Sequence, residues 1–333
     1  MALDDRAIVV GINRYPALGD LSGPANDATA FEAWLKDPKG GDVPAGNIVT
    51  ILSPPKAKAN PIDAQPNTAI VEAAFDVLYE RGDHSNGKAG RRLYIYMAGH
   101  GFAADLEEAA LLMANAARGR TGHHIPGRPY ANWFRRSAFF DEVVLFMDCC
   151  RDNLPRAPLR APPYEVLTSA NEARRFYGFA TKWSHTAREK KQNGKVRGVF
   201  TTTLLAGLYG AAPNENGRVT GASIQKYVFN SLPALLGPGE FQEPVFDFDS
   251  NNDLDFGQAG TQFQLHVKLS AAHAGKAITL VDGKLTPIAP IKTTANTADW
   301  DLAFGLYQVE VAGGPKRVVE LVGVPRKVSI GLG

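Results

Sequence analysis

The sequence has only two cysteines, Cys149 and Cys150, and they are adjacent. Neighbouring cysteines almost never bond to each other because the geometry is too strained, so a structural disulfide framework is excluded. No apolar stretch approaches the length of a membrane span, and internal repeats and low-complexity tracts are also lacking. The start, MALDDRAIVVGINRYP, is wrongly charged and its apolar run is too short for a signal peptide. We therefore expect a cytoplasmic protein without a membrane partner, whose thiols stay reduced.

Net charge of either sign is also nearly absent. Lys and Arg together number 36 and Asp and Glu 34, which gives a formal charge of +2. No global field therefore draws the protein toward nucleic acid, and we expect partners at a local site instead. Hydrophobic residues make up 44% of the 333 residues, and a chain of this length can form two domains.

Short apolar runs bounded by polar turns predict strands that are covered on both faces of a parallel sheet. These runs are residues 7–12, 48–52, 93–98 and 143–147. Between them, residues 25–36 and 68–81 carry apolar side chains at helical spacing, and such alternation is typical of βαβ units. A further strand at 177–180 and helices at 200–209 and 223–236 complete the α/β domain that we assign to residues 1–257.

The pattern of the sequence changes after this domain. Alternating runs such as QFQLHVKLSA, ITLVDGKL and LYQVEVAGG are separated by Gly, Pro and Asp, which is typical of a small β-sandwich. Asp282 and Gly283, within ITLVDGKL, give a hairpin signal. We expect residues 258–333 to form a β-sandwich domain that serves binding or docking rather than chemistry.

Two reactive side chains follow consecutive core strands. His100 lies between Gly99 and Gly101 after the third strand, and Cys150 follows the fourth. Ligands of open parallel sheets bind at the carboxyl ends of the strands, so thiol and imidazole should meet there and form a catalytic dyad. The backbone amides of Gly101 and Cys150 could then stabilise an oxyanion. The structural alternative, a histidine at a strand end and a buried small thiol, is less favoured because both residues end consecutive strands.

These residues resemble the caspase and metacaspase family, in which GHG follows one strand and DSCHSG or QACRG follows the next. The family's histidine stands about 50 residues before its cysteine, and His100 and Cys150 are separated by 50 residues. RAIVVGINRY, LSGPANDA and GVFTTTLLAGLYG extend the resemblance over about residues 6–250. The resemblance implies a caspase-like α/β/α sandwich with a mostly parallel sheet, and the activity of a cysteine endopeptidase.

Which cysteine attacks is decided by spacing. Family members carry an acid two residues before the nucleophile, and Asp148 stands two residues before Cys150. Positions i and i+2 of a strand share a face, so Cys149 should point to the opposite side as a buried thiol. Arg151 and Asp152 depart from the metacaspase pattern after the nucleophile.

The resemblance also implies a preference for Arg or Lys before the scissile bond. In metacaspases the specificity pocket is lined by the Asp of DSC and the Asp of an ND pair, and both are present as Asp148 and Asp27. Two carboxylates suit a guanidinium, with its paired donors. The alternative for Asp27 is an acid that interacts with a helix dipole. A pocket for aspartate would need arginines, and the one nearby, Arg14, is expected to be a solvated loop residue.

Two polar runs, GRTGHHIPGRP and TAREKKQNGKVRG, are interpreted as loops. His123 and His124 lack further ligands at metal spacing, so we expect a solvated loop there and no metal site. The second run resembles the family's intersubunit linker, where either self-cleavage or a plain exposed loop is expected. Calcium is a possibility that the resemblance raises, but no site is assigned, because the acids available follow no known calcium-binding pattern. These acids are Asp105, Glu107, Glu108, Asp247, Asp249 and Asp253.

The sequence therefore predicts a cysteine endopeptidase that needs no cofactor and cleaves proteins or peptides after Arg or Lys. By analogy with bacterial relatives, it could act in defence or regulated death with a regulatory protein partner. Two alternatives stay open: a catalytically weak scaffold of the same fold that recruits partners, and an esterase or acyltransferase that uses the same dyad.

Overall fold

The computed structural model describes residues 4–56, 60–85, 87–103, 108–150, 152–153, 159–167, 169, 171–192, 194–237, 239–260, 262–293, 296–322 and 327–333. The chain forms two compact units. The first consists of residues 1–201 and 242–254, and the second of residues 202–241 and 255–333. The boundary that the sequence places at residue 257 stays a prediction.

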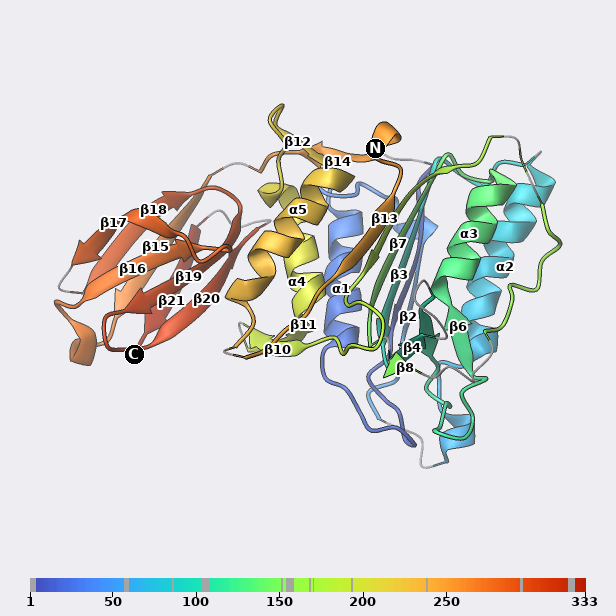
Figure 1. The fold of residues 1–333 in the computed structure, drawn as a ribbon, viewed down its shortest axis with the longest axis horizontal. Helices are drawn as coiled ribbons and strands as arrows, with labels where there is room; N and C mark the ends of the chain where they lie inside the picture. The colour runs from blue at the N-terminus through green and yellow to red at the C-terminus, as the bar shows by residue number, and fades with distance from the viewer. Residues whose placement is uncertain are drawn as a thin grey trace. The chain divides into compact units, whose positions relative to one another are not determined.

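A six-stranded sheet forms the centre of the first unit, in the order β13-β9-β7-β3-β1-β2 (Figure 1). Its strands are β1 (Arg6–Gly11), β2 (Ile48–Leu52), β3 (Arg92–Gly99), β7 (Glu142–Cys149), β9 (Arg174–Phe179) and β13 (Val245–Phe248). All neighbours pair in parallel except β13, which runs antiparallel to β9. The predicted α/β class with a mostly parallel sheet is confirmed.

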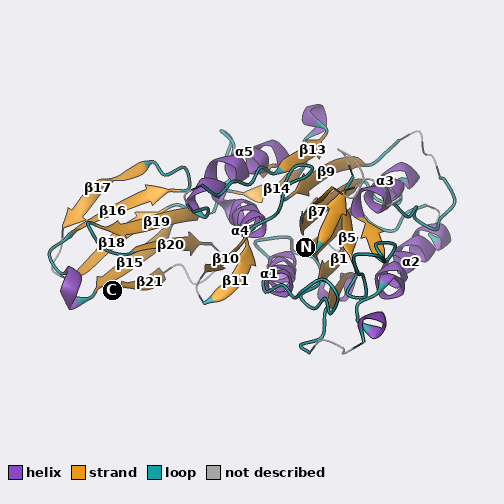
Figure 2. Ribbon diagram, turned by 60° about the horizontal axis from the view of Figure 1, so that its bottom comes forward, coloured by secondary structure: helices purple, strands orange, loops and turns teal. Residues whose placement is uncertain are grey.

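Helices cover both faces of this sheet. Helix α1 (Pro24–Lys36) lies on one side, and α2 (Thr68–His84) and α3 (Gly127–Ser137) lie on the other (Figures 1 and 2). Phe31 of α1 stacks on Tyr96 of β3 with ring centroids 4.6 Å apart, whereas Phe75 of α2 meets Tyr130 of α3 at 4.4 Å. Helix α3 is absent from the sequence prediction because it starts in a Gly- and Pro-containing run, which indicates a loop.

A second, small sheet continues from the carboxyl ends of β3 and β7. Its strands, in the order β6-β5-β4-β8, are β4 (Gly101–Ala103), β5 (Ala110–Leu112), β6 (His124–Pro126) and β8 (Asp152–Asn153). His124 is fully buried in β6, so the prediction of a solvated loop at this histidine is wrong. Its Nδ1 contacts the Thr121 carbonyl at 2.6 Å, and its Nε2 accepts the Arg160 N–H at 3.1 Å.

The register between β3 and β7 has a constant offset of 50 residues. It runs from Arg92 opposite Glu142 to Gly99 opposite Cys149. The same offset returns where β4 pairs with β8, with Phe102 opposite Asp152. One register therefore extends across the break in which His100 and Cys150 lie.

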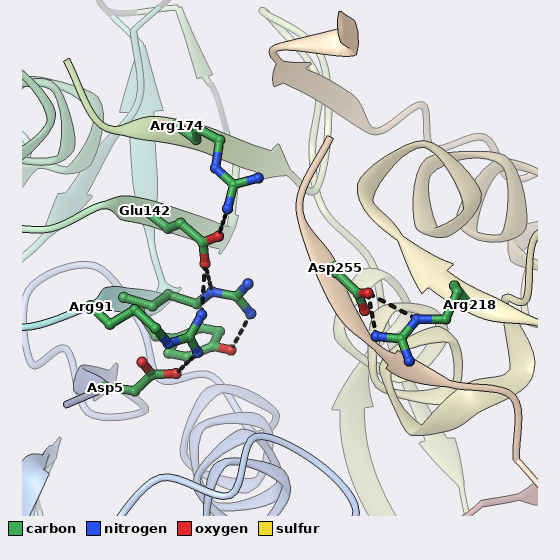
Figure 3. Close-up of polar contacts among 8 residues, drawn as sticks. Asp5, Arg91, Glu142, Arg174, Arg218 and Asp255 are labelled. Carbon is green, nitrogen blue, oxygen red and sulfur yellow. Dashed lines mark hydrogen bonds and ion pairs between the residues drawn. The ribbon is translucent and has the colours of Figure 1, made fainter. Parts of the chain in front are cut away.

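Charged residues begin three neighbouring strands and form a ladder at the amino end of the sheet. Arg92, Glu142 and Arg174 are the first residues of β3, β7 and β9 and stand in register. Glu142 is 3% exposed and forms ion pairs with both arginines and with Arg91, which also pairs with the buried Asp5 (Figure 3). A buried carboxylate is tolerated only with such partners, so the ladder disfavours any other register.

The second unit contains helix α5 (Gly221–Ser231) and the C-terminal strands. Its sheets have the orders β18-β15-β21, β17-β16-β19-β20 and β12-β14, the last of which is joined by the Arg218–Asp255 ion pair (Figure 3). The strands are β12 (Arg218–Thr220), β14 (Asp255–Gln258), β15 (Phe263–Leu269), β16 (Ala277–Asp282), β17 (Pro287–Thr293), β18 (Thr297–Leu302), β19 (Gly305–Val311), β20 (Lys316–Leu321) and β21 (Lys327–Leu332). The two larger sheets share one apolar core, and Asp282 ends the first strand of a hairpin as predicted.

The remaining elements are short or lie at junctions. Helix α4 (Val199–Ala206) continues into a π-helical segment, and strands β10 (Glu189–Gln192) and β11 (Lys195–Gly198) form a hairpin. The interpretation of this basic run as a loop is therefore wrong. The short helical segments are η1 (Ala45–Asn47), η2 (Pro61–Asp63), η3 (Gly207–Ala211), η4 (Leu232–Ala234), η5 (Ser250–Asn252) and η6 (Ala271–His273).

The charge ladder predicts a large loss of stability on removal of its central acid. Glu142→Gln should lower the free energy of unfolding by about 3 kcal/mol, because the buried Arg92 loses its counter-charge. Denaturant unfolding would measure the loss. Glu80→Gln, a change of the same chemistry on an exposed helix position, should have little effect, and equal losses in both variants would contradict a special role of the ladder.

Candidate active site

His100 occupies the bend between β3 and β4. Its Nε2 lies 2.9 Å from the carbonyl oxygen of Gly19, in the loop after β1. Because a carbonyl oxygen only accepts hydrogen bonds, this contact assigns the ring proton to Nε2 and leaves Nδ1 as the basic nitrogen. The backbone of His100 is fixed as well, since its carbonyl accepts the Leu112 N–H of β5 at 2.8 Å.

The two cysteines differ in burial, as the alternation of a strand predicts. Cys149 is 2% exposed and belongs to the apolar core with Met147. Cys150, one residue beyond β7, is partly exposed. Asp148 forms its contacts away from that core, with Thr201. The structure therefore separates a buried thiol from an accessible one.

His100 and Cys150 stand one step beyond the paired residues Gly99 and Cys149. Neighbouring strands lie about 4.8 Å apart, so the register brings these two residues together. Gly101 lies directly against the cysteines: a Cβ there would be 2.6 Å from both the Cys149 Sγ and the Cys150 carbonyl oxygen. No larger residue fits this position, which explains the glycine after His100.

Asp27 and Asp148 approach one backbone segment from two elements. Asp27, in the first turn of α1, accepts the Gly198 N–H at 2.8 Å. Asp148 accepts the Thr201 N–H at 3.1 Å and its hydroxyl at 2.6 Å. A Cβ at Gly198 would be 2.1 Å from Asp148 Oδ2 and 3.1 Å from Asp27 Oδ2. The structure thus brings the two acids together, where they also cap the first turn of α4.

Burial dominates the electrostatics of this acid pair. It raises the pKa of Asp148 to about 6. It also raises the pKa of Asp27 well above its usual range, as does the charge of Asp148, while Arg197 has the opposite effect. Two buried carboxylates this close favour sharing a cation or a proton. A guanidinium is already present, since Arg197 Nε lies 3.4 Å from Asp27 Oδ1.

A third carboxylate, Glu189, lies near this pair and is absent from the pocket that the sequence predicts. It begins β10 and stands opposite Gly198 of β11, and its Oε2 accepts the Ser22 N–H at 3.3 Å. Its negative charge also contributes to the raised pKa of Asp148. The sequence does contain a signal for this hairpin, because an Asn-Gly dipeptide favours a two-residue turn.

The other candidate ligands have different roles. Asp247 pairs with Arg128 and Arg175 and Asp249 pairs with Arg175, whereas Asp105, Glu107 and Arg151 lie outside the described residues. In the part of the chain that is described, no three His, Cys, Asp or Glu side chains cluster as a metal site would require. Arg14 pairs with Asp20 at 2.8 Å.

A comparison with protein families shows the family of this chain. Residues 4–231 match the family described as "Caspase domain", which is well over half of the chain. The chain belongs to the caspase domain family. This family is one of cysteine peptidases.

The caspase-domain chain is also similar to a curated protein and to solved structures. A "probable protease" from a Desulfuromonadales bacterium is 29% identical over 221 residues, which cover 61% of this chain but 26% of that protein. The match thus spans about a quarter of the relative's length. Among solved structures, caspase-1 from Spodoptera frugiperda has a TM-score of 0.48 at 13% identity, covering 78% of this chain and 91% of that one. A Geobacter sulfurreducens protein has a TM-score of 0.43 at 14% identity, covering 73% and 92%. No described helix of the chain is both long and apolar enough to cross a membrane.

The difference in burial predicts selective labelling of one thiol. Iodoacetamide should label native wild type once, at Cys150, because Cys149 is shielded in the core; in denaturant both thiols should react. Peptide mass spectrometry would locate the label. Cys149→Ala should keep the native labelling and Cys150→Ala should lose it, whereas label on native Cys149 would contradict the assignment of faces.

Proposed function

We propose that this chain is a cysteine endopeptidase that cleaves after Arg, or less efficiently after Lys, with Cys150 as nucleophile and His100 as general base. The observation that supports the proposal is the shared register of β3 with β7 and of β4 with β8, since His100 and Cys150 directly follow the paired residues Gly99 and Cys149. An accessible thiol beside an imidazole is the arrangement that activates a cysteine at neutral pH.

The proposed reaction follows from the tautomer of His100. Its unprotonated Nδ1 takes the proton of the Cys150 thiol, and the thiolate attacks the scissile carbonyl carbon. The backbone N–H groups of Gly101 and Cys150 are the proposed donors to the oxyanion. The imidazolium then protonates the leaving amine, and a water that gives its proton to His100 hydrolyses the acyl-enzyme. The Gly19 carbonyl holds the ring throughout. This mechanism uses no metal or cofactor.

The acid cluster supports a basic residue before the scissile bond. Asp27, Asp148 and Glu189 converge near Gly198, and Asp27 already pairs with Arg197. In the proposal a substrate guanidinium replaces that of Arg197, and its planar donors bond more than one carboxylate. A substrate aspartate would instead add like charge to a weakly screened site.

The contact between Arg197 and Asp27 also suggests a site for self-processing. Arg197 lies at the end of the basic hairpin 189–198, so cleavage within this hairpin is the proposed self-processing step. A cytoplasmic role in bacterial defence, under a regulatory protein partner, is the wider proposal and rests on analogy alone.

Loss of the dyad should abolish catalysis. Cys150→Ala should remove peptide hydrolysis and Cys149→Ala should retain much of it, while His100→Ala should lower turnover by roughly a hundred- to ten-thousand-fold. Release of a fluorophore from Arg-terminated peptides would measure these rates in variants that are shown to be folded. Activity in Cys150→Ala would refute the nucleophile. Low activity on Arg-containing peptides together with high ester turnover would favour the esterase alternative, and an inactive wild type would favour the scaffold.

Selection for arginine should depend on the acids and on pH. Wild type should prefer Arg over Lys and reject Asp, and KM for Arg substrates should fall as pH rises through about 6, the pKa of Asp148. The sign follows because a bound guanidinium stabilises the ionised carboxylate, so binding releases a proton. Asp148→Asn should weaken Arg binding by about 2 to 5 kcal/mol and flatten this profile. Asp27→Asn and Glu189→Gln should also reduce the Arg preference.

The control for this series is Glu243→Gln, which removes an acid that pairs with Lys182 instead. It should leave the Arg preference and its pH dependence unchanged. A wild type that prefers Asp, or full Arg preference in all three acid variants, would show that Asp27, Asp148 and Glu189 are only structural.

A further inference from the structure

Tyr15, in the loop after β1, is fully buried, and its hydroxyl lies between two strands of the candidate active site. The hydroxyl accepts the backbone N–H of His100 at 3.0 Å and donates to the carbonyl oxygen of Leu112 at 3.0 Å. On the other side of the same residue pair, Leu112 N–H donates directly to the His100 carbonyl at 2.8 Å. One bond of this antiparallel pair is therefore direct and the other passes through the tyrosine.

An antiparallel pair normally exchanges two direct hydrogen bonds. Here the Tyr15 hydroxyl takes the place of the second one and holds the N–H of His100 away from Leu112. The backbone at His100 thus departs from the regular ladder pattern by one inserted oxygen atom.

Gly99 provides the space for this insertion. A Cβ at Gly99 would be 2.3 Å from the Tyr15 hydroxyl, and the residue has φ +155°. A side chain is excluded at this position by the tyrosine itself. The glycine before His100 is thereby explained by Tyr15, as the glycine after it is explained by the cysteines.

The rest of Tyr15 contacts the imidazole and its acceptor. Its ring meets the His100 ring edge-on with centroids 4.7 Å apart. Its carbonyl accepts the Gly19 N–H at 2.9 Å, and Gly19 in turn holds His100 Nε2. The Tyr15 N–H is bound by Asp20 Oδ1 at 2.9 Å. Backbone, ring and ring proton of His100 are therefore all positioned through this one residue.

We propose that Tyr15 is a positioning residue for His100, acting through the hydroxyl inserted between His100 and Leu112. The proposal rests on the proposed peptidase function. Without the hydroxyl, the His100 N–H is free to bond directly to the Leu112 carbonyl, which moves the imidazole relative to Cys150. A misplacement of about 1 Å can cost a hundredfold in rate.

Tyr15 does not itself titrate in the range of the reaction. Burial raises the pKa of its hydroxyl well above the ordinary value, so the hydroxyl stays protonated and continues to donate to Leu112. A change in the pH dependence of Tyr15→Phe would therefore report on the pair His100 and Cys150.

Tyr15→Phe tests the proposal, with Tyr177→Phe as its matched control. Tyr177 is equally buried in the same core, and its hydroxyl donates to Asn132 at 3.2 Å, away from the dyad. Tyr15→Phe should lower kcat by roughly 10- to 100-fold with little change in KM, and the pH profile of Cys150 alkylation should shift. Tyr177→Phe should change neither kcat nor that profile, even where it lowers stability to the same extent.

Thermal unfolding of both variants separates positioning from loss of fold. If Tyr15→Phe is unfolded at the assay temperature, incorporation of 3-fluorotyrosine at Tyr15 keeps the ring and hydroxyl but weakens the oxygen as an acceptor, and a smaller drop in kcat is expected. Wild-type kcat and alkylation profile in folded Tyr15→Phe, or in the fluorinated protein, would overturn the inference. A wild type without Cys150-dependent hydrolysis would instead overturn the proposed function, while the alkylation profile still tests the positioning.

Discussion

The constraint on which the site depends is the parallel register of β3 and β7. A single offset of 50 residues relates the two strands from Arg92 and Glu142 to Gly99 and Cys149, and the dyad residues are the next pair in that series. A slip of one residue would turn every side chain to the other face and place Cys149, not Cys150, beside the histidine. The geometry of the proposed dyad therefore depends on strand pairing.

The two ends of the central sheet differ in their side chains and in their roles. At the amino end, charges of alternating sign on the buried Arg92 and Glu142 and the partly exposed Arg174 favour this register. At the carboxyl end, β3 stops at Gly99 and β7 at Cys149, and the loop after β1 supplies the Gly19 carbonyl and the Tyr15 hydroxyl. The ion pairs at the amino end thus hold the strands in the register on which the candidate site at the carboxyl end depends.

The carboxylate oxygens of the acid cluster have both a structural role and a role in the proposed specificity. Asp27 and Asp148 cap the start of α4 and at the same time face an arginine of the chain. Their burial disfavours charge unless a cation is near. Any guanidinium that enters therefore competes with Arg197 and with the helix for the same oxygens, which couples the proposed substrate binding to the position of α4.

The sequence alone determined the class of fold and most elements of the central sheet, because alternation and glycine placement are local or strand-level signals; the pair His100 and Cys150, which their spacing of 50 residues indicates, stays a prediction. It also predicted the burial of Cys149, since a strand turns consecutive side chains to opposite faces. The burial of His124, helix α3, the contact of Glu189 with Ser22 and the inserted hydroxyl of Tyr15 were decided by the tertiary structure. Each depends on contacts between residues far apart in the chain, such as Tyr15 with Leu112, and no local pattern encodes which distant group will lie opposite.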